Sequence, residues 1–251
     1  MTIEEIEELI LDHYQDLDRS SDLKDTFKQV LVKFLQYHHV EDTEFDSLFC
    51  TIHNNFKLGH NCVACNLHES NRRIQVFLLG YKHFTDTYTV LTSFILLLYL
   101  QGENIDVYLK IMQLSEDLRK RDFQALITIK RWANFLKHPK TFLLVHHPNW
   151  KVETDQPFKA TVPGKIIDTI FVNKYYAGPD NNGELYNELL KERDVTVLFP
   201  DPVTIIEQFC KAQKKFVELI EQNQKYRDLL DNKATIHDFY IHLDEDECQI
   251  E

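Results

Sequence analysis

The amino-acid sequence predicts a mainly α-helical protein that carries a small β-sheet element inserted before its last long helix. Through about residue 140, apolar residues recur at helical spacing, and few helix breakers interrupt them. The chain of 251 residues contains six glycines and seven prolines, most of them in its second half. There, short β-branched and aromatic runs bounded by these turn residues predict strands.

The N-terminal part of the chain predicts three amphipathic helices that pack on one another. Thr2 and Glu5 have the spacing of a capping box, in which each side chain bonds the backbone of the other. Ser21 or Asp22 begins the second helix, and a third is expected over residues 44–56.

A group of cysteines and histidines follows this third helix. His60, Cys62, Cys65 and His68, with His53 as an alternative ligand, can supply the four ligands of a structural zinc site from one short loop. Only one Cys-x-x-Cys pair is present, and no second pair follows at zinc-finger separation. The sequence therefore favours buried cysteines in a turn between helices, with zinc as the alternative, and no other cofactor is expected.

The central part of the chain predicts further helices. Thr85 or Asp86 can cap the most apolar of them, and a polar turn at residues 101–104 is expected to end it. The expected helices of this region cover residues 69–81, 88–100 and 105–118.

The next predicted helix begins at about Asp122 and has two distinct faces. At roughly 100° per residue, its apolar residues gather on one side and its polar residues within a narrow arc on the other. The apolar side contains Leu126, Ile129, Ala133 and Leu136, and the polar arc contains Arg131, Asn134 and His138.

Pro139 disfavours the α conformation at the residue before it, so His138 is expected at or just past the last turn of this helix. The carbonyl groups at a helix C-terminus favour an imidazolium there. A histidine in this place can give and take a proton near neutral pH.

The arrangement of Arg131, six intervening residues and His138 resembles the signature of the HEPN superfamily (higher eukaryotes and prokaryotes nucleotide-binding domains). Asn134 matches the polar residue that the signature often carries between them. The resemblance implies a HEPN-like helical bundle, in which the β element lies between the motif helix and a closing helix.

The resemblance also implies an activity, namely metal-independent cleavage of RNA to 2′,3′-cyclic phosphate and 5′-hydroxyl ends. In this hypothesis His138 is the general acid or base, Arg131 stabilises the phosphate and Asn134 orients the imidazole or a phosphate oxygen. Lys130, Lys137 and Lys140 would bind the RNA substrate. Because each chain carries the motif once, the resemblance implies a homodimer. It also implies a toxin or antiviral defence effector, with an antitoxin or sensor protein as partner.

The same three polar residues also have a plain interpretation, because an exposed helix face usually carries such side chains without any function. Another hypothesis is a non-catalytic HEPN-like module that binds RNA or a nucleotide or serves dimerisation, with stabilisation by zinc as an alternative within it. The formal net charge of −12 favours this second class, since phosphate binding normally needs a basic surface. A local group of basic residues around the motif favours RNA cleavage instead, namely Arg119, Lys120, Arg121, Lys130, Lys137 and Lys140.

The part of the chain after the motif predicts three or four short strands, one short helix and a long closing helix. Strands are expected within residues 141–146, 151–153, 167–172 and 195–199, and helices at 184–192 and 203–230. The domain organisation is therefore a helical bundle over 1–140, a β-rich insertion over 141–201, the closing helix over 202–231 and a C-terminal segment over 232–251 that ends in an acidic tail.

The five cysteines are an odd number, and the N-terminus lacks a basic start followed by an apolar run. These features predict a protein of the reducing cytoplasm that has no membrane partner. The most apolar run, residues 94–100, is too short to span a bilayer.

Overall fold

The structure is a computed structural model. It describes residues 2–6, 8, 21–38, 63–81, 86–137, 148–153, 164–176, 185 and 187–231. Its architecture is mainly helical with a small sheet, which confirms the predicted fold class. The expected helix at 44–56, the expected strand at 141–146 and the acidic tail lie outside the described residues.

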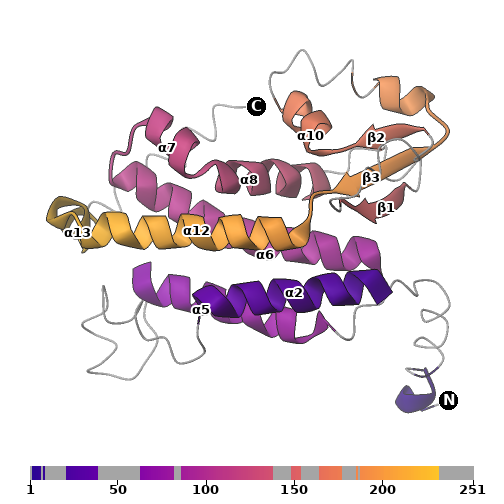
Figure 1. Ribbon diagram of the computed structural model, residues 1–251, viewed down its shortest axis with the longest axis horizontal. Helices are drawn as coiled ribbons and strands as arrows, with labels where there is room; N and C mark the ends of the chain where they lie inside the picture. The colour runs from indigo at the N-terminus through magenta and orange to yellow at the C-terminus, as the bar shows by residue number, and fades with distance from the viewer. Residues whose placement is uncertain are drawn as a thin grey trace.

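Among the described residues, five long helices form a bundle, and its arrangement can be followed in Figure 1. Each packs against the next in a closed ring, in the order α2, α5, α6, α8, α12 and back to α2. Two short helices, α7 and α13, extend the bundle at the end opposite the sheet (Figure 1). The helices are α2 (Ser21–Tyr37), α5 (Val63–Leu79), α6 (Thr87–Ile111), α7 (Glu116–Asp122), α8 (Gln124–Lys137), α12 (Pro202–Glu221) and α13 (Gln224–Asp231).

The bundle encloses an aromatic and aliphatic core. Phe27 of α2 packs edge-on against Phe94 of α6, with ring centroids 5.3 Å apart, and both side chains are fully buried. Tyr108 of α6 stacks on Phe216 of α12 at 6.0 Å. Burial of apolar faces on all five helices is what makes the ring stable, because short helices are marginal alone.

Within the described residues the sheet has three parallel strands in the order β1–β3–β2, namely β1 (Asn149–Val152), β2 (Lys165–Ile167) and β3 (Val195–Phe199). The central strand β3 is buried along its whole length, as expected of a parallel strand covered on both faces. Its bounds are those predicted from the sequence. At the start of β2, Gly164 has a φ of +81°, and a Cβ there would lie 2.1 Å from the carbonyl oxygen of Asp194, so only glycine fits.

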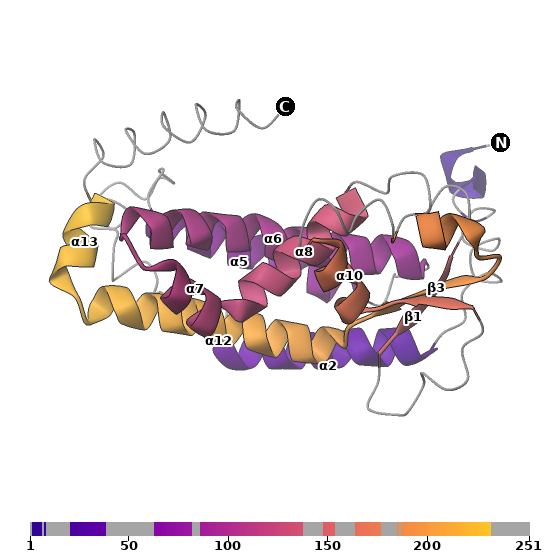
Figure 2. The ribbon, with the colours of Figure 1, turned by 90° about the horizontal axis from the view of Figure 1, so that it is seen from above.

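The sheet lies at one end of the bundle (Figure 2), and aromatic contacts join the two. The Trp132 ring of α8 lies 5.2 Å from the Phe199 ring of β3, and Trp150 of β1 lies 4.9 Å from Tyr88 of α6. The strand β3 continues directly into α12, whose first N–H groups donate to the Asp201 carboxylate. The sheet is therefore inserted between the motif helix and the closing helix, as predicted.

Several predicted helix starts are confirmed by their capping bonds. Thr2 N–H donates to Glu5 Oε2 (2.7 Å) and Glu5 N–H donates to Thr2 Oγ1 (3.2 Å), which makes the expected capping box. The helix α2 begins at Ser21, and Asp86 caps α6 by accepting from Thr89 N–H at 2.6 Å.

The polar turn expected at residues 101–104 is wrong, because α6 runs through it as one continuous helix. The side chain of Gln101 is completely buried and donates from Nε2 to Asn71 Oδ1 of α5 at 2.9 Å. Gly102 lies against α8, where a Cβ would be 3.5 Å from Leu126 Cδ2. Contacts with α5 and α8 thus hold in a helix residues that look like a turn in the sequence. The helix expected at 105–118 is divided between the end of α6 and α7.

The strand expected at residues 167–172 is also wrong beyond its first residue. The strand β2 ends at Ile167, and the next residues form the helix α10 (Thr169–Tyr175). Asp168 causes the change, because its carboxylate accepts from Phe171 N–H at 2.9 Å and caps the helix. Within α10, Phe171 and Val172 are buried against the rest of the fold, whereas Ile170 is exposed.

The single closing helix expected over 203–230 is two helices. The first, α12, ends at Glu221 with Gln222 as its C-cap, and α13 begins two residues later. Asn223 provides the start of α13 by accepting from Lys225 N–H at 3.1 Å. The expected short helix near 184–192 is present at the described residues 185 and 187–191.

Candidate functional site

The motif helix α8 lies across the bundle, between α6 on one side and α10 on the other (Figure 2). Its predicted apolar face is buried, and Trp132 and Phe135 widen that face. Trp132 is a core residue, as expected, and its Nε1–H donates to Thr169 Oγ1 of α10 at 3.2 Å. Arg131 and Asn134 are half-buried at the edge of this face, and Lys137 is exposed.

Arg131 has a neutral partner. Its Nη1–H donates to the side-chain oxygen Oδ1 of Asn173 on α10, at 2.8 Å. Within the described part of the chain this amide is its one hydrogen-bond partner, and no carboxylate pairs with it. This bond directs the guanidinium toward Asn173, and no carboxylate of the described residues compensates its charge.

Asn134 lies one helical turn after Arg131 on the same helix. Its side chain makes no hydrogen bond with any residue that the structure describes, so its amide can serve a ligand. His138 and Lys140 lie outside the described residues, and their predicted roles stay predictions. The described helix ends at Lys137, directly before His138.

Lys130 and Lys137 face α6 and do not join Arg131. Lys130 Nζ lies 2.9 Å from Glu103 Oε1, and Lys137 Nζ lies 4.0 Å from the centre of the Tyr99 ring. Burial by itself lowers the pKa of Lys130, but the hydrogen bond and the negative charge of Glu103 outweigh burial, so the pKa is raised. The two lysines and Arg131 therefore contact different neighbouring helices.

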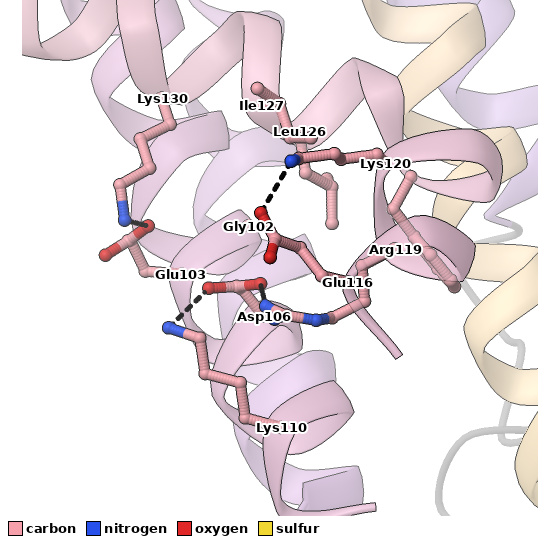
Figure 3. A pocket seen from close by; sticks show the side chains of 11 residues that line it. Gly102, Glu103, Asp106, Lys110, Glu116, Arg119, Lys120, Leu126, Ile127 and Lys130 are labelled. Atoms are coloured by element: carbon pink, nitrogen blue, oxygen red, sulfur yellow. Dashed lines mark hydrogen bonds and ion pairs between the residues drawn. The ribbon is translucent and has the colours of Figure 1, made fainter. Parts of the chain in front are cut away.

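A cavity of about 200 Å³ opens on this other side of the motif helix, between α6, α7 and α8 (Figure 3). Its floor is apolar, with Phe123 and Leu126. Charged side chains of both signs surround the floor, and Figure 3 shows them pointing toward one another in pairs. The pairs are Lys110 with Asp106, Arg119 with Asp106, Lys120 with Glu116 and Lys130 with Glu103, at 2.5–3.2 Å.

These ion pairs change the interpretation of the basic residues around the motif. Arg119, Lys120, Arg121 and Lys130 were expected to form a local basic patch, yet each has a carboxylate within 3.2 Å. The Lys120 ammonium beside Glu116 holds the pKa of that carboxyl below its usual range. The acidic neighbours thus neutralise much of the charge that the sequence suggested for RNA binding.

The expected zinc ligands are divided between described and undescribed parts of the chain. Cys65 and His68 lie in the first turns of α5, which begins at Val63, so they are not in a loop before a helix as predicted. His60 and Cys62 lie outside the described residues. The described residues contain no group of three or more metal-binding side chains, and zinc at this site stays a prediction.

Sequence reasoning missed a buried polar network at the centre of the bundle. Asn71 Oδ1 of α5 accepts from Gln101 Nε2 of α6 at 2.9 Å and from Gln213 Nε2 of α12 at 3.1 Å. Asn71 Nδ2 lies 3.4 Å from His38 Nδ1, directly after α2. Four helices are tied together by these bonds. The signal in the sequence was a polar residue at an apolar helical position, which is weak for a single residue.

Asn173 was likewise missed, because its partner Arg131 lies 42 residues away and α10 was not expected.

By length and apolar composition, α6 is the one helix among the described residues that qualifies as a membrane span. It packs here against α5, α8 and α12, and 44% of its apolar window is buried inside the structure. No protein-family model, curated protein or solved structure matches this chain.

Proposed function

We propose that this protein is a metal-independent endoribonuclease of HEPN type. The proposal starts from the sequence resemblance at Arg131, Asn134 and His138 and from the helical bundle that carries them. The main structural support is the environment of Arg131, which is half-buried and donates a hydrogen bond to the neutral side-chain amide of Asn173. A guanidinium of this kind has its charge and most of its donors available for a phosphate.

The contrast with the nearby basic residues supports this argument. Arg119, Arg121 and Lys130 are each within 3.2 Å of a carboxylate, as is usual for cations on a protein surface. An arginine that serves only the fold gains from such a partner. Arg131 has an amide in that place, and an amide stabilises its direction without cancelling its charge.

The proposed reaction needs one base, one acid and one cation. A base removes the proton of the RNA 2′-hydroxyl, the 2′-oxygen attacks the adjacent phosphorus, and the bond from phosphorus to the 5′-oxygen breaks. An acid protonates the leaving 5′-oxygen, so the products are a 2′,3′-cyclic phosphate and a 5′-hydroxyl. His138 of two chains would supply the base and the acid, and Arg131 would stabilise the charge on the phosphorane.

This scheme requires two copies of the motif and therefore a homodimer in which the two α8 helices approach each other. The roles of toxin or antiviral defence effector in the cytoplasm, and control by an antitoxin or sensor protein, belong to the same proposal. They rest on the family resemblance. Sedimentation or light scattering of the purified protein tests the dimer directly.

A second candidate function is a non-catalytic RNA-binding or dimerisation module. The pairing of Lys130 with Glu103 and the contact of Lys137 with Tyr99 favour its dimerisation form, because these two of the three predicted substrate-binding lysines already have partners within the chain. The net charge of −12 favours it as well.

Cleavage of a mixed panel of tRNA and single-stranded RNA in EDTA separates the two candidates. The wild-type protein is compared with His138→Ala, Arg131→Ala and a control, Arg121→Ala, which changes an exposed arginine paired with its neighbour Asp122. We expect cyclic-phosphate ends from the wild type and the control. Both motif variants should lose about 10²-fold or more in rate while keeping the helical circular dichroism signal.

Two results would contradict the nuclease. The first is cleavage that survives in His138→Ala, which would indicate a contaminant or another site. The second is a folded wild-type dimer that binds RNA and leaves it intact, which would establish the second candidate.

A further inference from the structure

We infer that Asn173 is the positioning residue of the proposed nuclease site, and that the inserted sheet and α10 exist in this fold partly to deliver it to Arg131. This inference rests on the proposed function and deepens it. The side-chain oxygen of Asn173 lies 2.8 Å from Arg131 Nη1, across two elements that are 42 residues apart in the sequence.

The helix α10 is docked along the motif helix by contacts on both sides of this bond. Trp132 Nε1–H donates to Thr169 Oγ1 at 3.2 Å. The Phe135 ring packs edge-on against Tyr175, with centroids 5.9 Å apart, and against Phe171 at 6.4 Å. Consecutive turns of the two helices therefore meet, and Asn173 has little freedom to move away from Arg131.

The position of α10 is also fixed from the sheet. Asp168 caps it directly after β2, and β2 pairs in parallel with β3. The strand β3 in turn contacts the motif helix through Phe199 and Trp132 and leads into α12. Packed elements thus form a closed path from α8 to α10, β2, β3 and back to α8. Through this path, the inserted sheet supports the hydrogen bond between Asn173 and Arg131.

The chemical identity of Asn173 matters more than its packing. An asparagine oxygen accepts one of the five N–H groups of Arg131 and leaves the positive charge uncompensated. An aspartate has the same shape, and it would keep the direction of the arginine while cancelling its charge. If Arg131 stabilises a phosphate, aspartate at this position must lower activity, whereas a purely structural arginine would be bound more tightly by it.

The test compares Asn173→Asp and Asn173→Ala with a matched control, Asn223→Asp. The control adds the same charge at the far end of the bundle, where Asn223 caps α13 and aspartate caps equally well (Figure 1). For the RNA that the wild type cleaves, we expect kcat/KM to fall about 10- to 100-fold in Asn173→Asp and less in Asn173→Ala. The control should match the wild type.

A double-variant cycle shows whether Asn173 acts through Arg131. Asn173→Asp should have no further effect in an Arg131→Ala background, because the group that it neutralises is absent there. Equal losses in both backgrounds would overturn the positioning role. Unchanged kcat/KM in Asn173→Asp, with an active wild type, would overturn it as well and leave the nuclease standing.

Failure of the nuclease itself is recognised separately. Binding of a ten-residue oligodeoxythymidylate, which lacks the 2′-hydroxyl and is not cleaved by this chemistry, is measured by fluorescence anisotropy for the same variants. If the wild type binds the oligonucleotide and cleaves no RNA, the nuclease proposal is wrong. In that case, about tenfold weaker binding by Asn173→Asp than by Asn223→Asp still supports the positioning role. If no RNA is cleaved and the two variants bind equally, or the wild type does not bind the oligonucleotide, both proposals are wrong.

Discussion

Replacing Asn71 by leucine should destabilise the bundle strongly, although the two side chains have a similar shape. Asn71 is 8% exposed, and its Oδ1 accepts from two amides that are themselves 0% and 1% exposed, those of Gln101 and Gln213. The substitution removes the acceptor and leaves both donors buried. Leucine cannot replace either bond.

The size of the destabilisation depends on which hydrogen-bond acceptors remain for the Gln101 and Gln213 side chains. Among the described residues, Gln213 Nε2 has no other acceptor, so it carries the full penalty of a buried unsatisfied group, about 1–3 kcal/mol. Gln101 Nε2 keeps a long contact of 3.5 Å to the Leu67 carbonyl oxygen, so its penalty is at the low end of that range. We expect a loss of roughly 2–4 kcal/mol in the free energy of unfolding.

Urea unfolding followed by circular dichroism measures this loss, with Arg72→Ala on the exposed face of α5 as the control that should show no change. The triple variant Asn71→Leu, Gln101→Met and Gln213→Met removes donors and acceptor together and should be more stable than Asn71→Leu alone. A single variant as stable as the wild type would refute the argument. A triple variant that loses the sum of the three single effects would refute it too.

Three further predictions concern other parts of the fold. Trp132→Ala should cost about 3–5 kcal/mol of stability in urea unfolding, and Trp132→Phe clearly less, because the ring is fully buried and its Nε1–H bonds Thr169; equal losses would contradict this. Burial, with the charge of Tyr175, raises the pKa of Tyr176 to about 12, above its ordinary value of 10.0. The neutral phenol therefore contributes stability below pH 10, and this contribution is lost as the pH rises from 10 to 12. Tyr176→Phe should show less of this alkaline loss, and identical pH profiles would count against it. Burial, with the charge of Glu207, raises the pKa of the Cys210 thiol, so peptide-level labelling by a thiol reagent should reach Cys210 only as the bundle opens in urea; rapid labelling of the folded protein would contradict its burial.

The sequence by itself determined the features that depend on neighbours a few residues apart. The structure confirms three such features, namely the amphipathic spacing of α2 and α8, the capping box of Thr2 and Glu5, and the helix cap at Asp86. The bounds of β3 agree with the short apolar, β-branched run at 195–199. A similar run at 167–172 forms a helix instead, because it contains Asp168 as a helix cap. From these, a mainly helical fold with a small inserted sheet follows.

The tertiary structure alone decided the features whose partners lie far apart along the chain. The polar stretch at 101–104 stays helical where Gln101 Nε2 donates to Asn71 Oδ1 within the core, and a local pattern cannot reveal a partner 30 residues away. Arg119 and Lys130 are paired with Asp106 and Glu103 on the neighbouring helix α6, which composition and spacing do not show. The sequence likewise supplied Arg131 as a candidate, but only packing of α10 on α8 gave it a neutral partner, because that contact depends on how the inserted sheet orients a helix against the bundle.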